Sequence, residues 1–191
     1  HWKNEDGLWS YKVKIKDGSY YPASDIIPLK KQIENTKLSI KKIKDILGSN
    51  RNIGIENNNF FPTGAYSIST SLDYLLAILE FDDLHLLFDI AHALVTCFNS
   101  YTDFKDYSEN LLSTNKCKQI HLCQPSYFYE KGKFFSKDAH EIPSYELTQL
   151  SIDLAYKWDI QNLTVEYYKD SDKLVSYLNY LSKVVQINEK K

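Results

Sequence analysis

The chain has 191 residues, of which 43% are hydrophobic and 25% are charged, and its formal net charge is −2. This length allows a single domain with a real core, and the charge argues against a protein that holds nucleic acid mainly by bulk attraction. No apolar run approaches the roughly 20 residues of a membrane helix, so no membrane association is expected. Three cysteines without paired spacing favour a reducing, cytoplasmic location over a disulfide framework.

Residues 1–27 are predicted to be an irregular lead-in with one hairpin. In "YKVKIKDGSYY", polar and apolar residues alternate around Asp17-Gly18, which is a favoured two-residue turn. Pro28 then opens a predicted helix that runs to Leu47, because apolar residues recur at helical spacing and a glycine follows.

From residue 52 onward, predicted strands and helices alternate along the chain. In order they are strand 52–56, helix 71–81, strand 84–90, helix 101–112, strand 117–122, helix 144–158, strand 162–168 and helix 171–185, the last with Ser171 as its N-cap. This alternation is typical of parallel βα units. We therefore expect an α/β fold in which residues 28–185 form βα units of one domain, 1–191, with a tail at 186–191.

Each predicted strand carries an ionisable residue at or near its C-terminal end. These residues are Glu56, Asp89, His121 and Glu166. The first two intervals between them, 33 and 32 residues, are close to the roughly 31-residue repeat of a (β/α)₈ TIM barrel. The third interval is 45 residues, and the excess falls in a predicted loop, 123–144. In a barrel the strand C-termini converge on one face, so we expect these four side chains in one cleft.

Three further side chains fit the same cleft. His92 follows Asp89 in the pattern D-x-x-H, and Asp138 and His140 form D-x-H within the long loop. The combined set has four carboxylates, three imidazoles and no thiolate, which suits iron, manganese or zinc. Crowded carboxylates repel one another unless cations lie between them. The sequence therefore predicts a site for two or three metal ions.

Less specific interpretations compete with this one. A carboxylate at a strand end often only caps a helix, and His92 by itself is compatible with a core histidine. His85 lies in mid-strand and is expected to be structural. Cys97 and Cys123 are candidates for redox activity, although buried unreactive thiols are more common. The aromatic stretch 126–135, "SYFYEKGKFF", is either a lid over the site or, as we expect, a packed loop at the barrel rim.

Five short motifs resemble, in order and spacing, the metal-binding strand ends of xylose isomerase-like TIM barrels. They are "IGIENN", "LLFDIAH", "QIHLCQ", "DAHEIP" and "LTVEYY". Within that superfamily the chain most resembles the multinuclear non-haem iron-dependent oxidative enzymes, of which the methanobactin-biosynthesis iron enzyme is the type. Ile55-Glu56-Asn57 is similar to the Leu-Glu-Asn strand end of that family, and a proline-started helix precedes it here as it does there. The resemblance covers most of residues 28–185.

The resemblance implies a (β/α)₈ barrel of which this chain corresponds to the second part, from about strand four or five to strand eight. The first three strands are expected to be missing. His1-Trp2 is similar to the tail of an earlier strand, so His1 is either a strand-four ligand or the remnant of a tag. The implied metal ligands are His1, Glu56, Asp89, His92, His121, Asp138, His140 and Glu166. The catalytic set within them is Glu56, Asp89, His121 and Glu166.

The activity that the resemblance implies is O₂-dependent oxidation by an iron cluster, acting on a small molecule or on a peptide, often at a cysteine. A separate protein that presents the peptide is an expected partner. Zinc and manganese are the alternative metals. Three other functions remain open: a metal-dependent phosphodiesterase similar to the apurinic endonuclease of the superfamily, a sugar isomerase or epimerase with paired carboxylates around one ion, and a non-catalytic barrel fragment.

Overall fold

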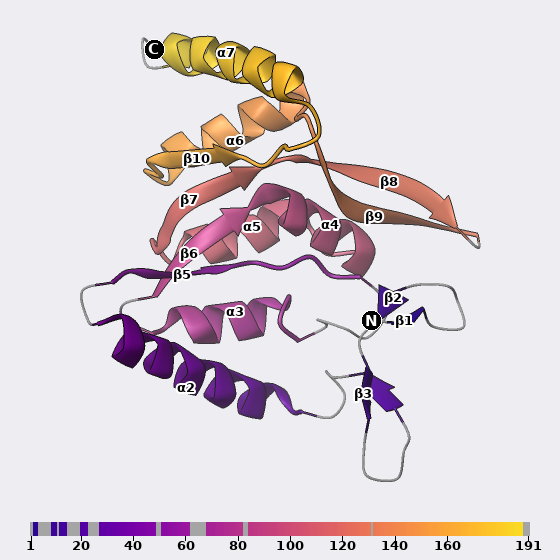
Figure 1. Cartoon of the computed structure of the whole chain (residues 1–191), viewed down its shortest axis with the longest axis vertical. Helices are drawn as coiled ribbons and strands as arrows, with labels where there is room; N and C mark the ends of the chain where they lie inside the picture. The colour runs from indigo at the N-terminus through magenta and orange to yellow at the C-terminus, as the bar shows by residue number, and fades with distance from the viewer. Residues whose placement is uncertain are drawn as a thin grey trace.

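A computed structural model describes residues 27–48, 51–61, 68–81, 84–130 and 132–188, together with the backbone of four short strands in the first 26 residues (Figure 1). These strands pair as two antiparallel hairpins: β1 (Trp2–Lys3) with β2 (Trp9–Ser10), and β3 (Lys12–Lys14) with β4 (Tyr20–Pro22). The second hairpin falls where the alternation predicts one. Its register places Lys14 opposite Tyr20, whereas a two-residue turn at Asp17-Gly18 requires Lys14 opposite Tyr21.

Four parallel strands form the central sheet. They are β5 (Ile53–Glu56), β6 (Leu84–Asp89), β7 (Cys117–Leu122) and β10 (Asn162–Val165). Their order across the sheet is also their order along the chain, and every neighbouring pair is parallel. Parallel neighbours need crossover connections, and each connection here contains at least one helix. The α/β class with a parallel sheet, as predicted from the sequence, is therefore confirmed.

Six helices lie within the described residues. They are α2 (Leu29–Leu47), α3 (Leu72–Leu79), α4 (Ile90–Ser100), α5 (Phe104–Leu112), α6 (Tyr145–Lys157) and α7 (Ser171–Asn188). As expected, α2 starts after Pro28 and stops at Gly48, whose φ of 86° favours glycine. Side chains of Ser71 and Ser144 accept N–H groups in the first turns of α3 and α6. No helix in the described part of the chain is both long and apolar enough to cross a membrane.

The segment between β6 and β7 differs from the prediction. The sequence predicted one helix at 101–112, but α4 already begins directly after β6 and α5 begins only at Phe104. Tyr101 ends α4 in the left-handed region with φ 57°, and Asp103 caps α5. Most of α4 is buried, including Ile90, Ala91, Ala93, Val95, Thr96, Cys97 and Asn99. A helix that is buried on most sides lacks the apolar stripe by which helices are predicted from sequence.

The predicted loop at 123–144 is also wrong, because most of it forms an antiparallel hairpin. Strand β8 (Gln124–Glu130) pairs with β9 (Lys133–Glu141), and Gly132 between them has φ 80°. The two strands extend beyond the end of the central sheet (Figure 1). Tyr129 and Phe134 are 63% and 65% exposed on the hairpin, so the aromatic stretch is not simply a packed loop.

The central sheet is buried mainly on one face. Leu86, Phe88 and Ile120 point into a core that they share with residues of the helices, and a fully buried side chain of this size contributes about 1.5–3 kcal/mol. On the other face of the sheet, Gln119 is only half-buried and Thr164 is exposed. In a doubly wound sheet helices would cover both faces, so the described residues do not form that architecture.

The sequence predicted Ser171 as the N-cap of α7. In the structure, Asp170 caps this helix instead. Asp170 Oδ1 accepts the backbone N–H of Asp172 at 3.0 Å and that of Lys173 at 3.1 Å. Serine and aspartate are both good caps, so sequence preference alone does not distinguish two adjacent candidates. The backbone path into the helix decides which oxygen reaches the free N–H groups.

We predict that Asp170→Ala lowers the free energy of unfolding by about 1 kcal/mol, because two first-turn N–H groups lose their acceptor. Ser171→Ala is the matched control, and a change within about 0.5 kcal/mol is expected. Urea unfolding followed by circular dichroism measures both variants. A larger loss in the Ser171 variant would show that the cap is misassigned.

Candidate metal centre

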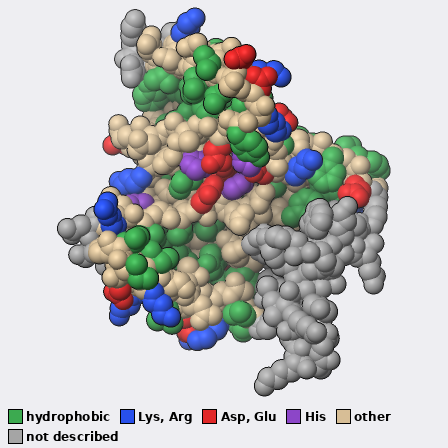
Figure 2. Space-filling view, viewed as in Figure 1, with side chains coloured by type: hydrophobic (Ala, Val, Ile, Leu, Met, Phe, Trp, Pro, Cys, Tyr) green, Lys and Arg blue, Asp and Glu red, His purple; other side chains and the backbone are tan. Residues whose placement is uncertain are grey.

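Seven predicted site residues meet at the C-terminal edge of the central sheet. Glu56 ends β5, Asp89 ends β6, His92 lies in the first turn of α4, His121 lies near the end of β7, Asp138 and His140 lie on β9, and Glu166 directly follows β10. Figure 2 shows acidic and histidine side chains gathered near the middle of one face. His1, the eighth predicted ligand, lies outside the described residues.

Carboxylates and imidazoles alternate along a chain of contacts. His92 lies between Glu56, at 3.5 Å from Nδ1 to Oε1, and Asp138, at 3.4 Å from Nε2 to Oδ2. His140 lies between Asp138, at 3.1 Å from Nδ1 to Oδ2, and Glu166, at 3.6 Å from Nε2 to Oε2. His140 also has φ 46°, a left-handed backbone that is uncommon outside glycine and that recurs at functional sites.

His121 closes this chain into a ring. Its Nδ1 is 2.7 Å from Glu166 Oε1 and 3.5 Å from Glu56 Oε1. Asp89 lies beside the ring, with Oδ2 at 3.9 Å from His92 Nδ1. The structure therefore brings together every predicted site residue that it describes, although their sequence positions span more than half of the chain.

Two buried polar atoms in this cluster have no hydrogen-bond partner: Asp89 Oδ2 and His121 Nδ1. Asp89 is fully buried, and its other oxygen accepts the backbone N–H of His92 at 2.6 Å as the cap of α4. The short distance from His121 Nδ1 to Glu166 does not have hydrogen-bond geometry. An unpaired buried polar atom costs about 1–3 kcal/mol. A cation between these atoms would satisfy both of them, so the residues fit a metal ion.

Two groups of side chains present metal-ligand atoms that all lie within 4.8 Å of one another. The first is Glu56, Asp89, His121 and Glu166, and the second is Cys123, His140 and Glu166. Oxygen and imidazole donors suit iron, manganese or zinc. Glu166 belongs to both groups, with Oε1 toward His121 and Oε2 toward His140. Its carboxylate therefore lies between the two groups.

Burial and neighbouring charges shift the pKa values of several site residues. Burial raises the pKa of Asp89 to about 6. Burial also disfavours the charged form of His92, but the hydrogen bond to Asp138 and the nearby carboxylates outweigh it and raise the His92 pKa to about 9. The neighbouring His121 and His92 imidazoles lower the pKa of Glu56 despite its partial burial. Without metal, the protonated His92 imidazole therefore compensates the carboxylates beside it.

The predicted ligand set does not include Cys123, and the structure places this residue beside the cluster. It follows His121 by two residues, a spacing that puts both side chains on the same side of an extended chain and would have indicated its position. Its Sγ–H donates to Asp138 Oδ1 at 3.4 Å. Burial, together with the carboxylates Asp89 and Asp138, raises the pKa of the Cys123 thiol, and burial raises that of Cys97 to about 12. Protonated buried thiols are poor nucleophiles, which does not support a redox role.

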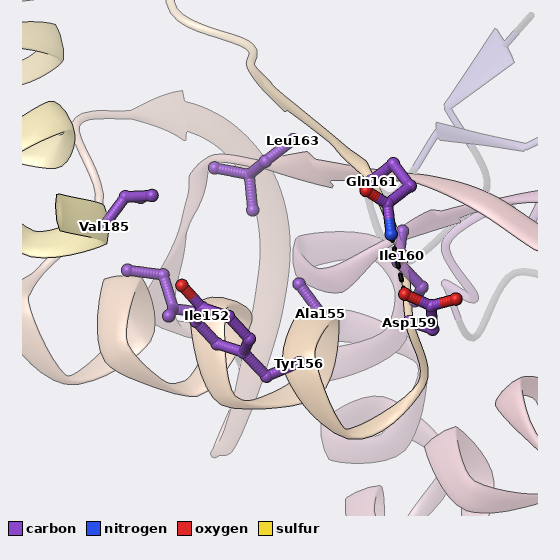
Figure 3. Close-up of a pocket in the computed structure, with 8 residues that line it drawn as sticks. All are labelled: Ile152, Ala155, Tyr156, Asp159, Ile160, Gln161, Leu163 and Val185. Carbon is purple, nitrogen blue, oxygen red and sulfur yellow. Dashed lines mark hydrogen bonds between the residues drawn. The ribbon is translucent and has the colours of Figure 1, made fainter. Parts of the chain in front are cut away.

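A separate cavity of about 280 Å³ lies near the start of β10, away from the cluster (Figure 3). Ile152, Ala155, Leu163 and Val185 provide its apolar wall, and Gln161 donates to Asp159 at 2.7 Å at its edge. It shares no residue with the metal centre, so it is not part of this site.

Asn57, the last residue of the motif Ile55-Glu56-Asn57, contacts Asp89 and His92 in a way that the motif alone does not indicate. Its side chain is fully buried and joins the ends of β5 and β6: Nδ2 donates to Asp89 O at 2.9 Å, and Oδ1 accepts the Asp89 N–H at 2.8 Å. The backbone carbonyl of Asn57 is 2.9 Å from His92 Nδ1. If a metal ion binds His92 in its neutral form, an Nδ1–H donated to this carbonyl would leave Nε2 as the ligand atom.

We predict that Asn57→Ala lowers the free energy of unfolding by about 3 kcal/mol, because it removes both buried hydrogen bonds between its side chain and the backbone of Asp89. Asn58→Ala is the control, with an expected loss of about 1 kcal/mol or less. Chemical unfolding of the two purified variants gives this comparison. Similar losses in both would mean that the reciprocal bonds to Asp89 contribute little.

Comparison with known proteins agrees with this geometry. Residues 15–187 match the family described as RiPP precursor modification enzyme MbnB/TglH/ChrH. A UPF0276 protein of Acaryochloris marina (strain MBIC 11017) is 33% identical over 104 residues, which cover 54% of this chain and 35% of that protein. The matched region thus spans about a third of the curated relative. The family resemblance seen in the motifs is confirmed, and the chain belongs to the MbnB/TglH/ChrH family of RiPP precursor modification enzymes.

Proposed function

We propose that this chain holds two or three iron ions and uses O₂ to oxidise a peptide substrate, with a cysteine side chain as the preferred target. The observation that carries the proposal is the ring of alternating carboxylates and imidazoles, together with two unpaired buried ligand atoms, one in the ring and one beside it. Membership of a RiPP precursor modification family supports a peptide as the substrate. It also favours this reaction over the phosphodiesterase and sugar isomerase alternatives.

A (β/α)₈ barrel is the proposed architecture, with this chain contributing about strands four or five to eight. Two observations support it. The parallel strands follow one another across the sheet in chain order, and the helix-facing side of the sheet is the buried one. The cluster lies at the C-terminal ends of the strands, where barrel enzymes carry their active sites.

The proposed ligands divide between neighbouring ions. Glu56, Asp89, His121 and Glu166 would hold one ion, and His140 with Glu166 would contribute to holding a second. His92 and Asp138 complete the ring on the other side. Iron bound there would supply the redox chemistry that O₂ activation needs. The carboxylates would balance the charge of the ions, and we propose that a separate partner protein presents the peptide.

The first test of this proposal is metal content, measured by inductively coupled plasma mass spectrometry on protein purified without oxygen or chelators. Two or more irons per chain are expected. Zinc in place of iron would favour hydrolysis, in which a bound water supplies the nucleophile. A chain that retains no metal would overturn the proposal and favour a non-catalytic role.

We predict that Asp89→Asn and His121→Ala each reduce the bound iron by at least one ion per chain. Asn at position 89 keeps the capping oxygen of α4, so the fold is expected to survive while the charged ligand is lost. His85→Ala is the control, because His85 lies within β6 rather than at its C-terminal end. Metal analysis and circular dichroism are measured on the same samples. Unchanged iron in both site variants would contradict the assigned ligands.

A further inference from the structure

We infer that Gln119 is a positioning residue that orients His121 for metal binding, through a hydrogen bond from His121 Nε2–H to the Gln119 amide oxygen. The inference deepens the proposed function and rests on its metal site. It concerns the side of the His121 ring that faces away from the cluster. Neither the motifs nor the family match assigns a role to Gln119.

Gln119 lies two residues before His121 on β7, so both side chains point to the same face of the sheet. Its terminal amide nitrogen is 3.1 Å from His121 Nε2 and 2.6 Å from Thr164 Oγ1. Thr164 is the β10 residue that pairs with His121 in the parallel register. The amide of Gln119 is therefore held between the imidazole and the threonine hydroxyl.

The opposite nitrogen of the ring, Nδ1, faces the metal ligands. It lies 3.5 Å from Glu56 Oε1 and 2.7 Å from Glu166 Oε1, and it is buried without a hydrogen bond. A neutral imidazole carries one proton, so Nδ1 can bind a metal only when that proton is on Nε2. A proton on Nε2 then needs an acceptor on the side where Gln119 lies.

The amide of glutamine can present either its nitrogen or its oxygen to the same neighbours after a rotation of about 180°. With the nitrogen toward His121, Nε2 must be the acceptor, and the proton on Nδ1 would block the metal. With the oxygen toward His121, the amide can accept from Nε2–H and from the Thr164 hydroxyl at once, because a carbonyl has two lone pairs. The hydroxyl serves as donor or acceptor, so Thr164 keeps its hydrogen bond in both orientations.

The test compares Gln119→Leu, which removes the acceptor, with Gln119→Glu, which keeps it. The probe is Zn²⁺, since it is diamagnetic and suits this donor set. Partners that orient a metal-bound histidine typically contribute 10–100-fold in metal affinity. We expect Zn²⁺ affinity to fall 10–100-fold in Gln119→Leu and to remain at or above the wild-type value in Gln119→Glu. Gln149→Leu on α6 is the matched control and should bind like the wild type.

A second readout on the wild-type chain does not depend on any variant. Nitrogen-15 NMR of the histidine rings distinguishes a proton on Nε2 from one on Nδ1, and we expect His121 to carry it on Nε2 when Zn²⁺ is bound. A zinc-bound His121 with its proton on Nδ1, or an unchanged affinity in Gln119→Leu, would overturn the inference and leave the metal centre intact. A wild-type chain that binds neither iron nor Zn²⁺ would overturn the metal centre and this inference together.

Discussion

The parallel register of β5, β6, β7 and β10 is the constraint on which the site depends. It places Asp89 beside His121 and His121 beside Thr164, so strands that are distant in sequence end at the same edge of the sheet. The side chains at those strand ends therefore lie close together. A shift of the register by one residue would turn these side chains to the opposite face of the sheet. It would also remove Leu86 and Phe88 from the core, so burial of these two residues helps to fix the register on which the site depends.

Bringing four carboxylates together is electrostatically costly, and the chain offsets that cost with three histidines. Each imidazole of the ring stands between two carboxylates. A purely structural network of ion pairs would be expected to satisfy its buried atoms, yet Asp89 Oδ2 and His121 Nδ1 remain without partners. Both residues belong to a group of four whose ligand atoms lie within 4.8 Å of one another, an arrangement that suits a cation.

The ligands are held by groups that lie outside the cluster. Asn57 ties the end of β5 to the end of β6 through both backbone groups of Asp89, and the α4 cap fixes one Asp89 oxygen while the other stays free. The β8–β9 hairpin delivers Asp138 and His140 from outside the central sheet. Tyr129 and Phe134 of this hairpin are exposed to solvent. The hairpin therefore contributes residues to the site and also presents an aromatic surface to solvent.

The sequence by itself determined the local features: the strand-end carboxylates, the D-x-x-H turn after β6, the proline start of α2 and the parallel βα class. Each of these depends on residues close together in the chain, where spacing and propensity act directly. Only the tertiary structure decided that 90–100 is a helix buried on most sides, that 124–141 is a hairpin, and that Asn57 binds the backbone of Asp89. Those outcomes depend on contacts between distant segments, and burial against such segments overrides local preference.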